Sequence, residues 1–140
     1  MLVVRVHELV PKPVWSKRYG QINDFESMLD VNGVKIIKFF LHISKEEQKR
    51  RFQARLTDPA KLWKASEADF AERRFWDDYM AAFEDAISKC TSENAPWYVI
   101  PANKKWFRNL AVSRIIVETL QGLKMKYPKA TIDPSKIVIE

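Results

Sequence analysis

A run of ten mostly apolar residues, VKIIKFFLHI at positions 34–43, constrains the fold of this chain more than any other feature. Near-continuous hydrophobicity of this kind is typical of a strand buried on both faces, as in a parallel sheet. The run leads directly into Ser44, and Glu47 follows three residues later. This S-x-x-E spacing predicts a capping box, in which the hydroxyl and the carboxylate each satisfy a free backbone N–H at a helix start. A helix therefore begins at the carboxyl end of a strand, where ligand sites of α/β sheets collect.

Two helical patterns follow, joined by a break at Thr57-Asp58-Pro59. The residue before a proline is pushed out of the α region, so the first helix ends there. Phe52 and Leu56 lie four residues apart and are expected to dock this helix. Seven basic residues lie on or beside the joint: Arg50, Arg51, Arg55, Lys61, Lys64, Arg73 and Arg74. Such a cluster favours a partner that carries phosphate.

The second of these helices carries both an apolar stripe and basic residues. Ser66 with Asp69 forms a weaker cap, and the stripe consists of Trp76, Met80, Phe83 and Ile87. Arg73 and Arg74 lie in the early turns, where the helix dipole is positive and slightly disfavours them. This placement indicates an anionic partner, but surface arginines beside neighbouring acidic residues explain it equally well.

A second strand and further helices complete the fold class. Residues 97–101, WYVIP, form a short apolar strand, and a helix at 106–123 keeps an inward stripe of Val112, Ile116, Leu120 and Leu123. A helix at 18–29 is expected to bury Ile22, Phe25, Met28 and Leu29. Spacing assigns five aromatic residues to the core: Trp76, Phe83, Trp97, Trp106 and Phe107. Two strands linked by a long helical crossover make a parallel β-α-β-α unit. The chain is therefore predicted to be α/β and mostly helical, with two parallel core strands at about 34–43 and 97–101.

The two ends of the chain carry weaker patterns. Leu2–Val6 favours a strand by its β-branched residues, although five apolar residues do not separate a strand from a buried helix. Two prolines predict a loop at 10–14. Near the other end, Ile137-Val138-Ile139 is expected either to add an edge strand or to stay loose.

The composition fits one globular domain with an anionic partner. The chain has 140 residues, of which 46% are hydrophobic, and this is enough for one core. The 24 Lys and Arg residues exceed the 18 Asp and Glu residues by six, which leaves nucleotide, polyphosphate, nucleic acid and acidic lipid open as partners. No recognition-helix or RNA-binding motif supports nucleic acid. No apolar run reaches the length of a membrane span, and we expect a cytoplasmic location.

The cysteine, the histidines and the paired aspartates offer little chemistry. Cys90 is the single cysteine, so an internal disulfide is excluded, in agreement with a reducing cytosol. No neighbouring residue is of a type that activates its thiol. His7 and His42 show no metal-ligand spacing. Asp77 and Asp78 are neighbours on a helix and point about 100° apart, which suits neither a shared metal nor an acid–base pair. We therefore predict no catalytic residue and no metal ligand in this chain.

Three strings in the sequence resemble one known family. They are YGQINDFESML (19–29), KFFLHISKEEQKRRFQARLTDPAKLWKASEADFAERRFWDDYMAAFEDA (38–86) and APWYVIPANKKWFRNLAV (95–112). Strings of this length and order are far more specific than a short motif. The chain resembles the carboxyl-terminal half of a polyphosphate kinase 2 family protein over residues 1–128, with 129–140 as a tail.

The resemblance implies a three-layer P-loop kinase fold that moves a phosphoryl group between polyphosphate and AMP or ADP with Mg²⁺. It places a lid, a helical hairpin that closes over the phosphates, at about 50–75, and it favours a helix at Leu2–Val6. Positioned basic side chains stabilise the charge that spreads over a migrating phosphoryl group. The residues expected to bind phosphate are Arg51, Arg55, Lys61, Lys64 and Arg73, with Trp63 as a packing or base-stacking contact.

One part of the family pattern is missing from this sequence. A Walker A loop needs glycines for a backbone cradle and a following lysine for the β- and γ-phosphates. The three glycines, Gly20, Gly33 and Gly122, are followed by Gln, Val and Leu, and no apolar strand ends in an aspartate that could serve as Walker B. In the family both motifs lie upstream. The chain is therefore expected to keep the lid, to bind no Mg²⁺ by itself and to be inactive alone.

Other hypotheses stay open beside a truncated phosphotransferase. The chain is alternatively a polyphosphate- or nucleotide-binding module, the complementing half of a split kinase, or a relic whose charges form an ordinary solvated face. Without neighbours, the strand at 34–43 would present an unpaired apolar edge, which predicts a homo-oligomer or association with a separate amino-terminal half. The choice between AMP and ADP stays open.

Overall fold

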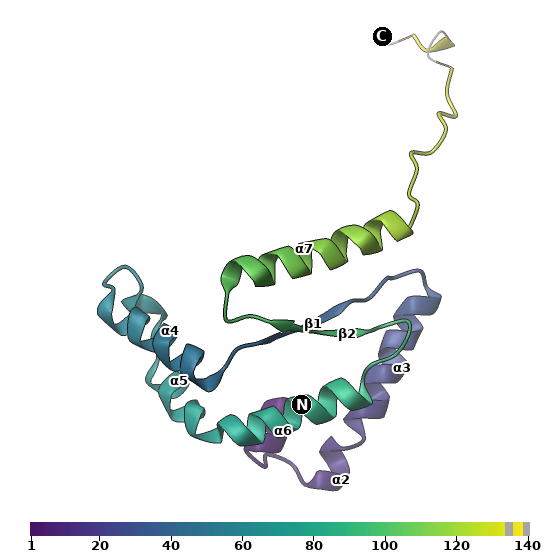
Figure 1. Cartoon of the computed structure of the whole chain (residues 1–140). Coiled ribbons are helices and arrows are strands. Elements are labelled where there is room, and N and C mark those ends of the chain that lie inside the picture. The colour runs from purple at the N-terminus through teal and green to yellow at the C-terminus, as the bar shows by residue number, and fades with distance from the viewer. Residues whose placement is uncertain (134–135, 139–140) are drawn as a thin grey trace.

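The computed structural model describes residues 1–133 and 136–138. Figure 1 shows its elements in chain order from purple to yellow: α1 (Leu2–Val6), α2 (Lys12–Trp15), α3 (Arg18–Val31), β1 (Lys38–His42), α4 (Lys45–Thr57), the 3-10 turn η1 (Leu62–Lys64), α5 (Glu67–Glu72), the 3-10 turn η2 (Arg73–Phe75), α6 (Trp76–Lys89), β2 (Trp97–Pro101) and α7 (Lys105–Gly122). The predicted α/β class, mostly helical with two parallel strands, is confirmed.

The two strands form a parallel pair at the centre of the fold. Lys38 lies opposite Trp97, and His42 lies opposite Pro101. α7 covers one side of the sheet and α6 the other (Figure 1), so the chain is folded in three layers. On the α6 side, the ring centroid of Phe40 lies 4.5 Å from that of Phe83. At its carboxyl end, β1 leads almost directly into α4, as the capping signal predicts.

β1 is shorter than the strand predicted at 34–43. Pairing starts only at Lys38, because β2 begins opposite that residue. The Lys38 ammonium, at the first residue of the strand, donates to the Glu26 carboxylate and to the Cys90 carbonyl oxygen. The strand is not fully buried on both faces, and Leu41 is 45% exposed. Its second edge has no strand partner within the described residues.

The inward stripe predicted for the last helix is wrong beyond the first half of that helix. Val112 is half-buried, but Ile116, Leu120 and Leu123 are exposed. At 1.5 Å per residue an 18-residue helix is about 27 Å long, whereas a strand of five residues spans about 17 Å. α7, which covers one side of the sheet in Figure 1, is therefore longer than the strands that it packs on, so the sheet does not cover all of its turns.

The buried face of α3 also differs from the prediction. Phe25 and Met28 are exposed, although both were expected in the core. The helix instead buries Tyr19, which shares a small core with Ala86 and Cys90 of the α6 end. Burial raises the pKa of the Cys90 thiol, so the thiol stays protonated at neutral pH and is a poor nucleophile.

The amino-terminal segment is helical. α1 confirms the helix implied by the family resemblance over the strand favoured by β-branching, and its Arg5 pairs with Asp85 of α6. The loop predicted at 10–14 is confirmed for Val10 and Pro11 and wrong from Lys12 on, because α2 starts at Lys12 with Pro13 in its first turn. A proline is tolerated there, since its missing N–H would have no partner within the helix.

The segment after α7 contains little regular structure. Ile137 and Val138 belong to no helix or strand, and Ile139, the last residue of the proposed edge strand, lies outside the described residues. Among the helices described, none has both the length and the apolar character needed to cross a membrane.

Candidate functional site at the carboxyl ends of the strands

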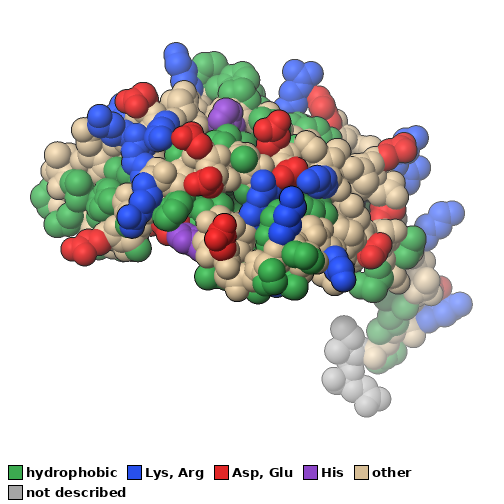
Figure 2. All heavy atoms as spheres, turned by 90° about the horizontal axis from the view of Figure 1, so that it is seen from below, with side chains coloured by type: hydrophobic (Ala, Val, Ile, Leu, Met, Phe, Trp, Pro, Cys, Tyr) green, Lys and Arg blue, Asp and Glu red, His purple; other side chains and the backbone are tan. Residues whose placement is uncertain are grey.

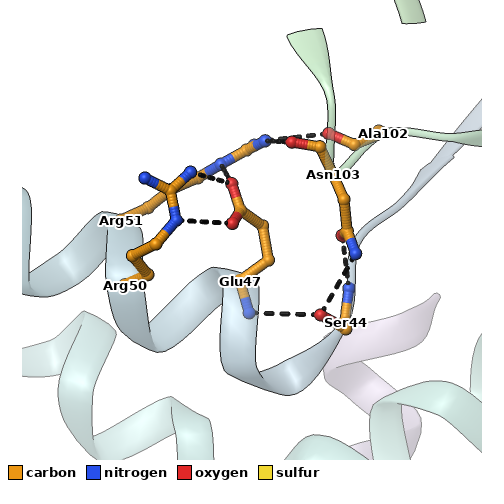
Figure 3. A network of polar contacts seen from close by, with 6 residues as sticks. All are labelled: Ser44, Glu47, Arg50, Arg51, Ala102 and Asn103. Atoms are coloured by element: carbon orange, nitrogen blue, oxygen red, sulfur yellow. Dashed lines mark hydrogen bonds and ion pairs between the residues drawn. The ribbon is translucent and has the colours of Figure 1, made fainter. Parts of the chain in front are cut away.

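A network of polar contacts ties the start of α4 to the loop that follows β2 (Figure 3). Ser44 caps α4, because its hydroxyl accepts a hydrogen bond from the Glu47 amide at 3.2 Å. The second half of the predicted capping box does not form. The Ser44 amide donates instead to the side-chain oxygen of Asn103 at 2.9 Å. This contact joins the carboxyl ends of both strands and frees the Glu47 carboxylate for other partners.

The Glu47 carboxylate holds two arginines. Arg50 donates to both of its oxygens at 2.7 Å, and Arg51 donates from Nε at 2.8 Å. The Arg51 guanidinium also donates to the carbonyl oxygens of Ala102 and Asn103, 2.8 and 3.3 Å away. Arg51, one of the residues predicted to bind phosphate, therefore spans from α4 to the loop between β2 and α7.

Hydrogen bonds from Arg50 and then Arg51 lower the pKa of Glu47 from an ordinary value of 4.5 to about 2. Because the pKa is depressed in the folded state, the charged carboxylate stabilises the fold above pH 4.5, and this contribution is lost as the pH falls towards 2. We expect the wild-type chain to exceed Glu47→Gln in stability at about pH 6 and expect the difference to shrink at about pH 3. Urea unfolding at both pH values measures the two differences, and a difference that does not change with pH would contradict the pairing.

α4 and α5 pack as a helical hairpin beside this network. The rings of Phe52 and Phe70 meet edge to face with centroids 5.2 Å apart, whereas Leu56, also predicted to dock α4, is exposed. Arg73, just after α5, joins the hairpin to the start of α4. Its guanidinium donates to a main-chain carbonyl there at 2.7 Å and to the Gln48 side-chain oxygen at 2.9 Å.

The other residues predicted to bind phosphate lie on the hairpin and its turn. Arg55 lies 4.0 Å from an aspartate of α5, and Lys61 pairs with the aspartate that follows α4. The Lys64 ammonium lies 4.9 Å from the ring centroid of Trp63, which is 78% exposed. These side chains all lie on the hairpin and its turn. Each has a separate partner, however, and they do not converge on one pocket. Their role in binding phosphate stays a prediction.

Charges of both signs cover the face below the sheet. Figure 2 shows Lys and Arg side chains interleaved with Asp and Glu there rather than gathered into one patch. Interleaved surface charges are screened by solvent and counterions. The ordinary surface role therefore stays open for single basic residues on this face.

Two pockets lie near the carboxyl end of β1. The first, of about 320 Å³, follows β1 from Phe40 to Ile43 and reaches Arg73. The rest of its lining comes from α4, α5, η2 and α6, so the pocket lies between β1 and these helices. The second, of about 500 Å³, lies at the carboxyl ends of both strands, and Lys45 and Lys104 belong to its lining.

Trp106 and Phe107 line the second pocket and were wrongly assigned to the core. Trp106 is 65% exposed and Phe107 is 39% exposed. α7 begins beyond the carboxyl end of β2, so its first turn extends past the sheet. In contrast, Trp76, Phe83 and Trp97 are half-buried, in keeping with their predicted core role.

The sequence reasoning missed Lys45 and Lys104. β1 ends at His42 and β2 at Pro101, and these two ends lie opposite each other in the parallel register. Each lysine follows the end of its strand at the same interval. Because ligands of α/β sheets bind at the carboxyl ends of strands, this matched placement was the available signal.

The described residues contain no cluster of metal-ligating side chains. Within residues 1–133 and 136–138, no three His, Cys, Asp or Glu side chains gather closely enough to hold a metal ion. Magnesium requires an octahedral set of oxygen ligands, usually with one or two carboxylates. We therefore assign no metal-dependent step to these residues.

Comparison with known proteins places this arrangement in a family. The family model described as Polyphosphate kinase 2 matches residues 1–128. The AMP/ADP-polyphosphate phosphotransferase of Meiothermus ruber is 56% identical over 140 residues, which cover 100% of this chain and 52% of that protein. The ADP-polyphosphate phosphotransferase of Rhodopseudomonas palustris is 48% identical over 143 residues, covering 94% of this chain and 50% of that protein.

The fold agrees with a solved structure. The crystal structure of Polyphosphate Kinase 2 from Arthrobacter aurescens superposes with a TM-score of 0.91 at 48% sequence identity, and the match covers 95% of this chain and 47% of that one. This chain spans about half the length of the curated relatives it matches, and the matched part is their carboxyl-terminal half. From its sequence and its fold alike, the chain belongs to the polyphosphate kinase 2 family.

Proposed function

We propose that this chain is the lid-bearing half of a phosphotransferase that moves a phosphoryl group between polyphosphate and AMP or ADP. The supporting observation is its match to the carboxyl-terminal half of the Meiothermus ruber AMP/ADP-polyphosphate phosphotransferase, including the basic hairpin that follows β1. The family supplies the reaction type, and the hairpin supplies the cations that such a reaction needs.

In this proposal the lid is the hairpin of α4 and α5, at about 50–75. A migrating phosphoryl group spreads negative charge over its oxygens, so cations that close over it stabilise the transition state and exclude water. The proposed phosphate contacts are Arg55, Lys61, Lys64 and Arg73, with the exposed Trp63 packing on the substrate. Arg51 is also a proposed phosphate contact, and its hydrogen bonds to Glu47 and to two carbonyl oxygens tie the lid to the loop after β2.

The proposal predicts that the chain binds long-chain polyphosphate with strong salt dependence, because each neutralised phosphate releases counterions. Isothermal titration calorimetry at about 50 mM and about 200 mM salt measures the slope of log affinity against log salt. The double variant Lys61→Gln/Lys64→Gln should bind more weakly, with a slope reduced by about 1 for each lysine.

The matched control for that test is Lys124→Gln/Lys126→Gln, which removes the same charge from the segment after α7. This variant should keep the wild-type slope, because its lysines lie outside the hairpin. Binding that is insensitive to salt, or an equal loss of affinity in the two double variants, would exclude the hairpin as the polyphosphate site.

A second candidate function is the complementing half of a split kinase. It is favoured by the second edge of β1, which has no strand partner within the described residues. An exposed strand edge presents unpaired N–H and C=O groups that pair readily with a strand of another chain. A separate chain that carries a Gly-Lys phosphate loop would add its strand there. The homo-oligomer expected from the same edge also stays a prediction.

A further inference from the structure

The hairpin of α4 and α5 is attached to the rest of the fold at two places. At its start, β1 leads into α4 through the Ser44 cap, and Arg51 ties that end to the loop after β2. At its end, α5 passes into α6 through η2, the 3-10 turn at Arg73–Phe75. A 3-10 stretch inside a longer helical run often marks a hinge, because its hydrogen-bond geometry is poorer than that of an α-helix. Contacts that fix η2 therefore fix how the hairpin lies relative to α6.

His7, which follows the last residue of α1, lies against this hinge. Its Nε2 lies 3.0 Å from a carboxylate oxygen of Glu72, the last residue of α5. An ionised carboxylate only accepts hydrogen bonds, so the imidazole donates from Nε2. The imidazole also meets the ring of Phe75 edge to face with centroids 4.8 Å apart, and the ring of Tyr79 with centroids 6.5 Å apart. One side chain from α1 therefore contacts α5, η2 and α6 together.

Tyr79 of α6 holds the same carboxylate from the other side of the hinge. Its hydroxyl donates to the Glu72 oxygen that His7 contacts, at 2.8 Å. Hydrogen bonds from His7 and then from Tyr79 lower the pKa of Glu72, so this carboxylate is charged at neutral pH. Burial, and then the hydrogen bond to Glu72, raises the pKa of Tyr79, so its hydroxyl keeps its proton. Two donors, one from α1 and one from α6, thus bind one oxygen at the end of α5.

His7 links the hinge to an element outside the hairpin and α6. The other hydrogen bonds, ion pairs and ring contacts that α5 and η2 make with the described part of the chain join them to each other, to α4 or to α6. Without His7, the hairpin would be free to turn about η2 as far as those contacts allow. The His7 side chain is 28% exposed, so solvent replaces its contact with Glu72 only in part.

We propose that His7 is a positioning residue for the hairpin. From the end of α1, its imidazole binds the Glu72 carboxylate and packs on Phe75, and these contacts set the orientation of α4 and α5 relative to α6. His7 itself touches no phosphate and acts through Glu72. The attachment of the hairpin does not depend on any substrate, whereas its consequence, a lid held ready to meet phosphate, rests on the proposed function.

Hydrogen exchange of the whole chain without ligand, followed by mass spectrometry at neutral pH, tests this role. His7→Phe keeps an aromatic ring beside Phe75 but removes the donor to Glu72. Amides at 67–75 should then exchange about threefold to tenfold faster, the range that one net hydrogen bond supplies. Amides of α7, on the other side of the sheet, should keep their wild-type rates. His7→Gln restores an N–H donor without the ring and should bring the rates at 67–75 back towards the wild type.

The matched control is Arg5→Gln, which removes an ion pair between the same two helices, α1 and α6, but towards the carboxyl end of α6. Its amides at 67–75 should exchange as in the wild type, and circular dichroism confirms that each variant is folded. Equal rates at 67–75 in the wild type and His7→Phe would overturn the proposed role. An increase in Arg5→Gln equal to that in His7→Phe would also overturn it, because the effect would then belong to the docking of α1 as a whole.

Glu72→Ala removes the same contact from the hairpin side and leaves α1 unchanged. It should also speed exchange at 67–75, and adding His7→Phe should cause no further increase, because both substitutions remove one shared contact. A further increase of the same size in the double variant would show that His7 does not act through Glu72.

A polyphosphate titration separates this role from the proposed function. His7→Phe should weaken binding of long-chain polyphosphate by about threefold, because a less constrained hairpin has more freedom to lose on binding. The salt slope should stay that of the wild type, since no lysine or arginine is removed, whereas Lys61→Gln/Lys64→Gln lowers the slope itself. An unchanged affinity would show that the His7 contact does not prepare the hairpin for phosphate. If the wild type binds no polyphosphate, the proposed function fails while the exchange result still decides the attachment.

Discussion

Replacing Arg51 with alanine should lower the free energy of unfolding by about 2 kcal/mol, the typical magnitude for hydrogen bonds that involve a charged group. The Arg51 side chain is 24% exposed and its Glu47 partner is 11% exposed, so solvent compensates poorly for the lost contacts. The carbonyl oxygens of Ala102 and Asn103 would lose their donor at the same time. Alanine itself is a good helix former, so the loss comes from these contacts and not from helix propensity.

Arg50→Ala is the matched control for this prediction. Arg50 binds the same carboxylate from the same helix, but its side chain is 69% exposed and makes no contact with the loop after β2. Exposed ion pairs of this kind contribute little to stability. Urea unfolding at neutral pH, followed by circular dichroism, should therefore show a clear fall in midpoint for Arg51→Ala and little change for Arg50→Ala. Equal midpoints for the two variants would show that Arg51 does not anchor α4.

The parts of this fold that could be predicted are those set by short-range rules. The junction of a strand with a capped helix at Ser44 follows from neighbouring residues, and so do the end of α4 before Pro59 and the second strand at 97–101. Even here one half of the capping box is wrong, because Asn103 lies far along the chain and no local pattern announces it. The helix at Leu2–Val6 required the family resemblance, since five apolar residues fit either element.

The burial of apolar side chains could not be predicted, because it depends on how much surface the fold offers to cover them. Helical spacing placed Leu120 and Phe25 in the core, but a sheet of two short strands does not extend under all of α7 or α3. For the site, the sequence located the hairpin but not the partners of its cations. Arg51 illustrates the reason. Its partner Ala102 lies 51 residues further along the chain, and composition and spacing do not reveal contacts between residues so far apart in the sequence.

The second prediction with a large expected effect is the rate of phosphoryl transfer by these 140 residues on their own. The sequence contains no Gly-Lys pair, so it offers no glycine-rich cradle with a lysine for the terminal phosphates. Removing a single preorganised oxyanion donor from an enzyme costs about 10²–10³ in rate, and the cradle supplies several such donors. We therefore expect turnover at least about a thousandfold below that of a complete family enzyme.

The amino-terminal half of the Meiothermus ruber relative is the natural complement for this experiment, because the present chain matches the other half at 56% identity. Three reactions with polyphosphate, ADP and Mg²⁺ are compared: this chain alone, the amino-terminal half alone, and the two mixed. A mixture with a half whose P-loop lysine is replaced by alanine controls for contaminating kinases.

ATP formation in these reactions tests the central claim. This claim is that the chain supplies a lid that binds phosphate, and that the lid works only together with a glycine-rich phosphate-binding loop. We expect no ATP above the blank from either half alone. The mixture of intact halves should form ATP, and the mixture with the lysine variant should not. ATP formed at a substantial rate by the 140-residue chain without any partner would contradict it.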